Sequence, residues 1–261
     1  MSMSGPSGRD AEEQSGIDTA AALERVLAEG DEWQSWRALR LSGEEPGDPP
    51  AIPAQDELGS FPGPGGGASP GATGEALCHL AMLGLGGSGA AVVAADWLED
   101  MRTPALAWLD APSEVPGELD NPAAGRVWAT ASATCGLLAI GRDPGSRAMD
   151  LLRGEANSEG KVTGGAYPTF AASAVYWLAQ GPKTEMAEWG LRWTREYQEE
   201  WWGPWERASA LTFWAAAGIP GEHSSVEAFV EELRASAPEA GWTDDLGLTI
   251  RTLEVLNYFG S

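Results

Sequence analysis

Apolar residues recur along this chain at the three- and four-residue spacing of an α-helix. The pattern is clearest in the last stretch, which starts with the acids Asp244 and Asp245. Its apolar face comprises Leu246, Ile250, Leu253 and Leu256, widened by Val255 and Phe259. The final glycine, Gly260, suits the left-handed position just past a helix end. We therefore predict that a helix with an acidic start closes the chain.

The same pattern predicts ten helices upstream, the first of which is capped by Asp18. They cover 18–29, 32–41, 73–85, 90–101, 126–140, 146–153, 169–179, 185–199, 206–217 and 224–235. The helices at 73–85, 126–140, 169–179 and 206–217 are almost wholly apolar, whereas those that alternate with them are amphipathic. Half-buried and fully buried helices are thus expected to alternate along the chain.

Glycines that end helices mark a repeat. Gly141, Gly181, Gly218 and Gly260 are 40, 37 and 42 residues apart, and Gly86 precedes Gly141 by 55. A repeat of this length indicates stacked helical hairpins. Because the inner helices are too apolar to face water, a closed ring is favoured over an open superhelix. The expected fold is all-α: a double-layered α/α toroid of about five hairpins, forming a single domain over 17–261.

Two segments are expected to lie outside this pattern. Residues 1–16 are polar and small, carry no secretory signal, and are expected to be disordered. Residues 42–71 are rich in proline and glycine and are expected to form a loop. Such a loop is either a flexible tether or a lid over the domain, and the tether is favoured.

Charge excludes several classes of partner. The net charge is −23 and the only lysines are Lys161 and Lys183, which argues against nucleic acid and anionic membranes as partners. The most apolar run, 80–95, is too short and too rich in glycine to span a bilayer. Cys78 and Cys135 show no paired spacing, so no disulfide framework is indicated and the default location is a reducing cytoplasm.

The repeat units resemble the prenyltransferase and squalene-oxidase repeat of squalene–hopene cyclases, class II diterpene cyclases and protein prenyltransferase β subunits. The residues that carry the resemblance are Asp96-Trp-Leu98 and Gly241-Trp-Thr-Asp-Asp-Leu-Gly-Leu-Thr249, with a looser match at Trp205-Glu-Arg-Ala-Ser-Ala-Leu211. The resemblance covers roughly 73–260, and 42–71 has no counterpart in it. It implies an α/α toroid and is poorly specific for activity.

The resemblance also implies a site. Trp242-Thr-Asp-Asp245 is similar to the Asp-x-Asp-Asp motif of class II cyclases, with Trp242 in place of the first Asp, which makes Asp244 the acid and Asp245 its partner. The expected reaction is protonation-initiated cyclisation of an isoprenoid or other polyene, without a metal or other cofactor. Aromatic faces stabilise the cations formed. The candidates for this role are Trp128, Tyr167, Phe170, Trp205 and Trp242.

Other interpretations remain open. The protein could instead be a non-catalytic toroid that binds an apolar ligand or a partner protein. In that case the two acids only cap the helix, and the aromatic side chains only pack. Since class II cyclases usually carry two toroids, a second subunit could complete the cavity. A toroidal glycosidase would use paired carboxylates, for which Glu75, Asp120, Glu206 and Asp244 are available.

Zinc chemistry is disfavoured. Zinc-dependent prenyltransferases and lanthionine cyclases need cysteine and histidine ligands that converge, and only Cys78, Cys135, His79 and His223 exist. His79 follows Cys78 directly on a helix, so their side chains point about 100° apart. Gly63-Pro-Gly-Gly-Gly67 lacks the lysine and the preceding strand of a nucleotide-binding loop, so no nucleotide cofactor is expected either.

Overall fold

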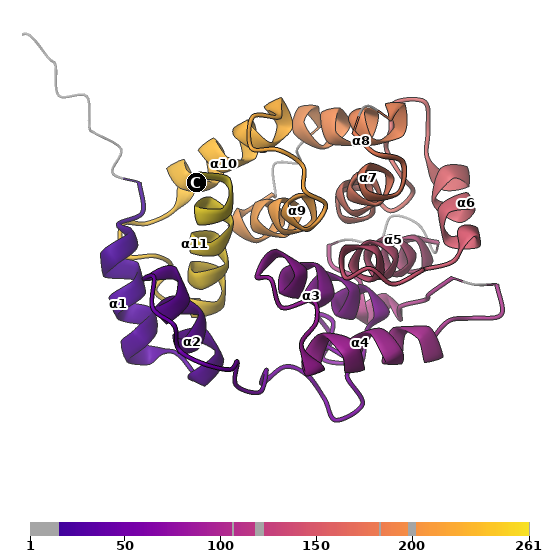
Figure 1. Ribbon diagram of the computed structural model, residues 1–261. Coiled ribbons are helices and arrows are strands. Elements are labelled where there is room, and N and C mark those ends of the chain that lie inside the picture. The colour runs from indigo at the N-terminus through magenta and orange to yellow at the C-terminus, as the bar shows by residue number, and fades with distance from the viewer. Residues whose placement is uncertain (1–15, 106, 118–122, 183, 198–201, 261) are drawn as a thin grey trace, which may run out of the picture.

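The computed structural model describes residues 16–105, 107–117, 123–182, 184–197 and 202–260. Within these ranges the regular structure is helical, with no strand, which confirms the all-α prediction (Figure 1). The helices are α1 (Thr19–Glu29), α2 (Glu32–Leu41), α3 (Pro70–Met82), α4 (Gly89–Asp100), α5 (Ala124–Ala139), α6 (Ser146–Glu155), α7 (Ala166–Gln180), α8 (Glu185–Glu196), α9 (Pro204–Ala216), α10 (Ser224–Ser236) and α11 (Leu246–Gly260), with a 3₁₀ turn η1 (Pro112–Glu114).

The helices form an inner and an outer layer. In Figure 1, α3, α5, α7 and α9 lie in the middle, and α4, α6, α8 and α10 surround them. The difference follows from sequence: the small apolar residues of α5 are buried almost without exception, whereas α6 buries only Ala148 and Leu152. Burial of apolar side chains is the main favourable term in folding, so the central helices carry most of the core.

The inner helices pack in chain order. Helix α3 contacts α5, α5 contacts α7, α7 contacts α9 and α9 contacts α11. Helix α3 also contacts α9 directly, so side chains rather than open space fill the centre of the fold. The first two helices pack on the last, α11, which brings the beginning and the end of the described chain together (Figure 1).

Two glycines explain the close approach of α3 and α5. A Cβ atom added at Gly74 would lie 2.3 Å from the carbonyl carbon of Ser132, and one at Gly136 would lie 2.4 Å from the carbonyl oxygen of Gly74. Real Cβ atoms do not come so close to backbone, because non-bonded heavy atoms repel one another strongly at such separations. The absence of side chains at these two positions therefore sets the distance between the helices.

Several predicted helix ends agree with the structure. Helix α2 has the predicted bounds, and the Asp18 carboxylate caps α1 by accepting hydrogen bonds from the N–H groups of Ala20 and Ala21. Gly141, Gly181 and Gly218 have φ of 80°, 85° and 68°, which is the left-handed conformation expected after a helix.

Other predicted ends were wrong. The left-handed glycine after α3 is Gly84, with φ of 73°, rather than Gly86. Helix α11 extends through Gly260, which has no left-handed φ, so this glycine is the last helical residue and not a stop. Position 199, in the predicted end of α8, lies outside the described residues.

All four inner helices begin earlier than predicted, α5 and α9 by two residues and α3 and α7 by three. Helix α3 begins at Pro70, three residues before Thr73, with the Ser69 hydroxyl accepting the N–H of Ala72 as its cap. Proline is compatible with the first turn because the N–H it lacks would be unpaired there. Helix α7 begins at Ala166 and accommodates Pro168 in the same way.

The proline- and glycine-rich segment 42–69 packs along α2, α3 and α4. The indole N–H of Trp36 donates to the carbonyl of Gly47 at 3.1 Å, and the N–H of Phe61 donates to the Thr73 hydroxyl at 2.9 Å. A bridge between Pro62 and Ala68 folds its last part into a short hairpin. The predicted disorder of residues 1–16 falls almost wholly outside the described residues.

None of the helices in the described ranges has the length and apolar character needed to cross a membrane.

Candidate functional site

The first turns of the inner helices meet at one end of the fold, here called the N-terminal mouth. Trp128 of α5 contacts Tyr167 of α7, whose hydroxyl reaches Glu206 of α9. In the next turn, Glu75 of α3 meets Ser209 of α9 and Arg251 of α11. These contacts show that residues far apart in sequence converge at this end.

Three of the predicted aromatics form one packed cluster. Trp128 and Tyr167 meet edge to face at 5.6 Å between ring centroids, and Tyr167 and Phe170 lie 5.2 Å apart. Phe213, which the sequence analysis did not select, contacts both Trp128 and Phe170. Trp128 and Phe170 are almost completely buried, and with Tyr167 and Phe213 between them they fill the centre of the fold.

The other two predicted aromatics lie further out. Trp205 is 41% exposed, and its indole N–H donates to Oδ2 of Asp245 at 2.8 Å. Trp242 is half-buried, and its carbonyl accepts a hydrogen bond from Arg25 at 3.0 Å. The ring of Trp205 is therefore held by a polar contact, whereas Trp242 is anchored through its backbone.

The two predicted acids differ in their surroundings. Asp245 caps α11: its Oδ1 accepts the N–H of Leu248 at 2.8 Å, three residues into the helix. Asp244 is exposed to solvent. An acid that protonates an alkene has to be kept protonated by burial, and the position of Asp244 supplies none. Its assignment as the acid stays a prediction that the geometry does not favour.

A polar cluster lies at the centre of the mouth. Oε1 of Glu75 accepts the Ser209 hydroxyl at 2.9 Å and lies 3.5 Å from a guanidinium nitrogen of Arg251. Arg251 also donates to the Thr212 hydroxyl at 3.1 Å. The Glu75 side chain is 21% exposed, so this ion pair is in contact with solvent.

Glu206 stands beside this cluster with both oxygens engaged. Oε2 accepts the N–H of Gly203 at 2.7 Å, which completes the cap of α9, and Oε1 accepts the Tyr167 hydroxyl at 3.0 Å. Burial, with help from Glu206 and Glu75, raises the pKa of Tyr167, so the phenol remains a hydrogen-bond donor. Glu206 is therefore a fixed negative charge rather than a free one.

A buried acid sits beneath the mouth in the loop before α5. Asp110 is 3% exposed, and its Oδ2 accepts the N–H of Gly71 at 3.1 Å. Its other oxygen and the indole N–H of Trp128 have no hydrogen-bond partner among the described residues. Burial raises the pKa of Asp110 to about 7, Glu114 adds to this, and hydrogen bonds from Ser69 and Gly71 oppose it.

A second ion pair lies deeper between α2, α3 and α11. Arg37 binds both oxygens of Glu254, and Nε2 of His79 lies 2.8 Å from the same carboxylate. Burial lowers the pKa of His79 to about 3, with Arg251 and Arg37 adding to this, so the ring is neutral and donates its Nε2 proton to Glu254. Burial alone would raise the pKa of Glu254, but Arg37 and His79 bring it well below its ordinary value.

The zinc candidates do not converge in the described part of the chain. His79 is engaged by Glu254, and His223 caps α10, its Nδ1 accepting the N–H of Ser225 at 3.2 Å. Cys78 and Cys135 are both buried as free thiols. Across the described ranges, no group of three or more His, Cys, Asp and Glu side chains is arranged to hold a metal ion.

Sequence reasoning identified part of this site. It selected the aromatics and named Glu75 and Glu206 among the carboxylates near the mouth, while Asp120 lies outside the described residues. It overlooked Arg251, although an arginine inside an otherwise apolar helix is a signal of a buried charge. Asp110 lies in a loop with no periodic pattern, so nothing local indicated its burial.

Compared with protein-family models and with curated proteins, the sequence matches none of them.

Proposed function

We propose that the chain forms an α/α toroid whose N-terminal mouth binds a small molecule carrying positive charge. The alternation of inner and outer helices and the packing of α1 and α2 on α11 support the toroid. The observation that carries the binding proposal is Glu75, a carboxylate held by Ser209 and Arg251 with part of its side chain open to solvent.

The charges at the mouth favour a cation. Three carboxylates at the mouth accept hydrogen bonds from neutral donors: Glu75 from Ser209, Glu206 from Tyr167 and Asp245 from Trp205. The whole chain carries a net charge of −23, which attracts cations and repels anions. Charge complementarity therefore selects a cationic ligand.

Aromatic rings add to this preference. Trp205 at the rim and Tyr167 beside Glu206 lie near the carboxylates. A cation over an aromatic face gains about 0.5–2 kcal/mol. Quaternary ammonium groups combine charge with an apolar surface, so they suit a site of carboxylates and aromatic rings.

A pair of ligands of matched shape tests the proposal. Choline and its neutral carbon analogue 3,3-dimethylbutanol differ only in the charged atom. We expect choline to bind at least about tenfold more tightly in ligand-detected NMR titrations, since a few contacts of this strength correspond to such a ratio. Equal affinities would show that the mouth does not select positive charge.

The second candidate function is catalysis at the same end of the fold, through a cationic intermediate, and the buried Asp110 favours it. With a pKa of about 7, this buried carboxyl keeps its proton in about half of the molecules at neutral pH, so it can act as an acid there. It would donate a proton to one alkene of an isoprenoid, leaving a carbocation beside Trp128 and Tyr167. A second alkene of the same molecule would attack this cation and close the ring, and the Asp110 carboxylate would take back a proton from the cyclic cation to form a new alkene.

This second candidate predicts products of unchanged mass. Incubation with squalene and with linear prenyl diphosphates, followed by mass spectrometry, should give cyclic isomers, and Asp110→Asn should remove them while the helical circular dichroism is retained. If wild-type protein yields no isomer, alone or with a partner subunit that completes the cavity, the mouth is a binding site only.

A further inference from the structure

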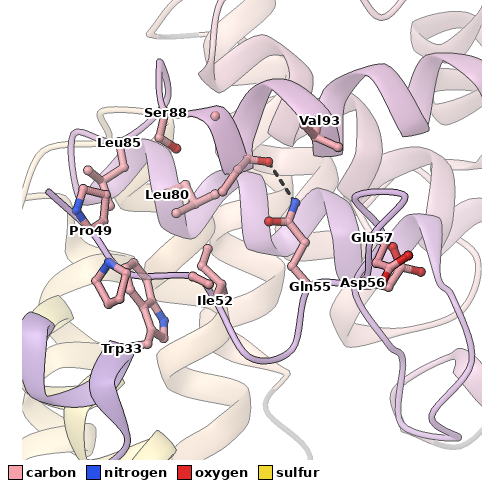
Figure 2. A pocket seen from close by; sticks show the side chains of 14 residues that line it. Trp33, Pro49, Ile52, Gln55, Asp56, Glu57, Leu80, Leu85, Ser88 and Val93 are labelled. Atoms are coloured by element: carbon pink, nitrogen blue, oxygen red, sulfur yellow. Dashed lines mark hydrogen bonds between the residues drawn. The ribbon is translucent and has the colours of Figure 1, made fainter.

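A separate pocket lies on the opposite side of α3 from α5 and α9, between α2, the segment 42–69 and α4 (Figure 2). Its volume is about 480 Å³, within the range of small-molecule sites. It is lined by Trp33, Pro49, Pro50, Ala51, Ile52, Gln55, Asp56, Glu57, Leu80, Leu85, Ser88, Gly89, Ala90 and Val93.

The body of this pocket is apolar. Figure 2 shows Trp33, Ile52 and Leu80 facing the same space from α2, the loop and α3. The Trp33 ring is fixed by stacking on Trp36, with the ring centroids 5.4 Å apart. An apolar wall held in place before binding loses little entropy when a ligand enters, which favours an aliphatic occupant.

One polar group is directed into this apolar space. The amide nitrogen of Gln55 donates to the carbonyls of Gly59 at 3.2 Å and Ala90 at 2.9 Å, and these bonds fix the side chain. Its carbonyl oxygen has no hydrogen-bond partner among the described residues, and Figure 2 shows it on the side facing Ile52 and Leu80. A ligand that donates a hydrogen bond to this oxygen would satisfy it.

The rim adds a selection by charge. The carboxylate of Asp56 is engaged within its own loop, where it accepts hydrogen bonds from the N–H groups of Leu58 and Ser60 and from the Ser60 hydroxyl. Glu57 beside it is exposed. These two carboxylates disfavour an anionic head group at the end of the pocket where Gln55 lies.

We infer that this pocket binds an aliphatic molecule whose head group donates a hydrogen bond to the Gln55 carbonyl oxygen, a hydroxyl or an ammonium group but not a carboxylate. The pocket shares no residue with the N-terminal mouth, so this binding is independent of the function proposed for Glu75. The aliphatic chain lies against Trp33, Ile52 and Leu80.

Displacement of a fluorescent probe tests the inference. N-phenylnaphthylamine, an uncharged aromatic amine with one N–H donor, should gain fluorescence with the full chain. Decanol and decylamine, whose heads donate, should displace it, whereas decanoate should require at least tenfold higher concentration. Because decanol is uncharged, its displacement of the probe reports recognition of the head group. Displacement by decylamine alone would also reflect the general attraction of a cation to an acidic protein.

Two neighbouring valines on α4 provide a matched pair of variants. Val93 lines the pocket and Val92 does not, and they are 42% and 40% exposed, so a larger side chain at either position fits at the surface. Val93→Trp should weaken decanol binding at least tenfold, and Val92→Trp should leave it unchanged. Choline binding at the mouth should be the same in both.

Three results would overturn the inference. One is the absence of probe binding, and another is equal displacement by decanol and decanoate. The third is equal binding of decanol by the two valine variants, which would place the ligand elsewhere on the surface.

Discussion

Glu75 of α3 and Arg251 of α11 lie 3.5 Å apart, and this ion pair joins the first of the inner helices to the last. The residues are 176 positions apart in sequence. The Ser209 hydroxyl from α9 holds the same carboxylate oxygen, so three inner helices meet at one acid. A partly exposed carboxylate fixed in this way is a ready counter-charge for a ligand.

The two acids before α11 should respond differently to substitution. Asp245→Ala removes the cap of α11 and a partner of Trp205, so it should reduce the free energy of unfolding by about 0.5–2 kcal/mol. Asp244→Ala changes an exposed side chain and should remain within about 0.5 kcal/mol of wild type. Urea denaturation of both variants measures the difference, and a larger loss for Asp244 would contradict the capping geometry.

The close contact of α3 and α5 predicts a strong effect of one methyl group. A Cβ at Gly136 would lie 2.4 Å from the Gly74 carbonyl oxygen, so Gly136→Ala should cost about 1–3 kcal/mol or more as the helices separate. Gly154 in α6 is the control, because a Cβ there meets nothing within 4 Å and Gly154→Ala should stabilise the helix by about 0.5–1 kcal/mol. Thermal denaturation should give a lower Tm for Gly136→Ala and a higher Tm for Gly154→Ala than for wild type.

The buried Asp110 predicts a dependence of stability on pH. Its pKa is about 7 in the folded protein against an ordinary value of 3.8, so the folded state retains a proton that the unfolded state releases between these values. Its stabilising contribution is complete below about pH 3.8 and is lost as pH rises to about 7.

Asp110→Asn isolates this effect, because the amide mimics the protonated acid. Measured from pH 4 to 8, the stability of the variant relative to wild type should rise with pH and level off above about 7. The total rise should be a few kcal/mol, since each pKa unit corresponds to about 1.4 kcal/mol. The lowered pKa values of His79 and Glu254 should make both proteins less stable as pH falls below about 6.5, which is opposite to the effect of Asp110. Subtracting the wild-type stability from that of the variant removes this shared trend. A difference that does not vary with pH would contradict the burial of Asp110.

The deeper ion pair should be costly to break. Glu254→Gln leaves the buried Arg37 without its counter-charge, and loss of one partner of a buried pair typically costs about 3–5 kcal/mol. Glu29→Gln removes the exposed partner of Arg25 and should cost about 0.5 kcal/mol or less. If chemical denaturation gives similar values for both, Arg37 has another partner or access to water.

The sequence predicted the parts of the fold that depend on local pattern. The bounds of α2 and the left-handed glycines at 141, 181 and 218 follow from apolar spacing and backbone conformation, which neighbouring residues determine. The start of α3 was missed because a proline beside glycines was interpreted as loop, although proline is also suited to the first turn of a helix.

The site depends on contacts that no local pattern encodes. The aromatic candidates were recognised because inner-helix starts share one end of a stacked hairpin array, and Trp128, Tyr167 and Phe170 do meet there. The pairing of Glu75 with Arg251 depends on which helices become neighbours in the centre, and the burial of Asp110 depends on how its loop packs on Gly71 and Gly125. Both are tertiary properties.

The central claim, that Glu75 is the counter-charge of a cationic ligand, is tested most directly by the dissociation constant of choline for Glu75→Gln. The exposed Glu24→Gln is the control, because it removes the same charge from the protein at a side chain that takes no part in the contacts of Glu75 with Ser209 and Arg251. We predict that Glu75→Gln weakens binding by about 10–100-fold, the loss expected of a charge-assisted contact, while Glu24→Gln stays close to wild type. Equal affinities for the two variants, with both folded, would contradict the account.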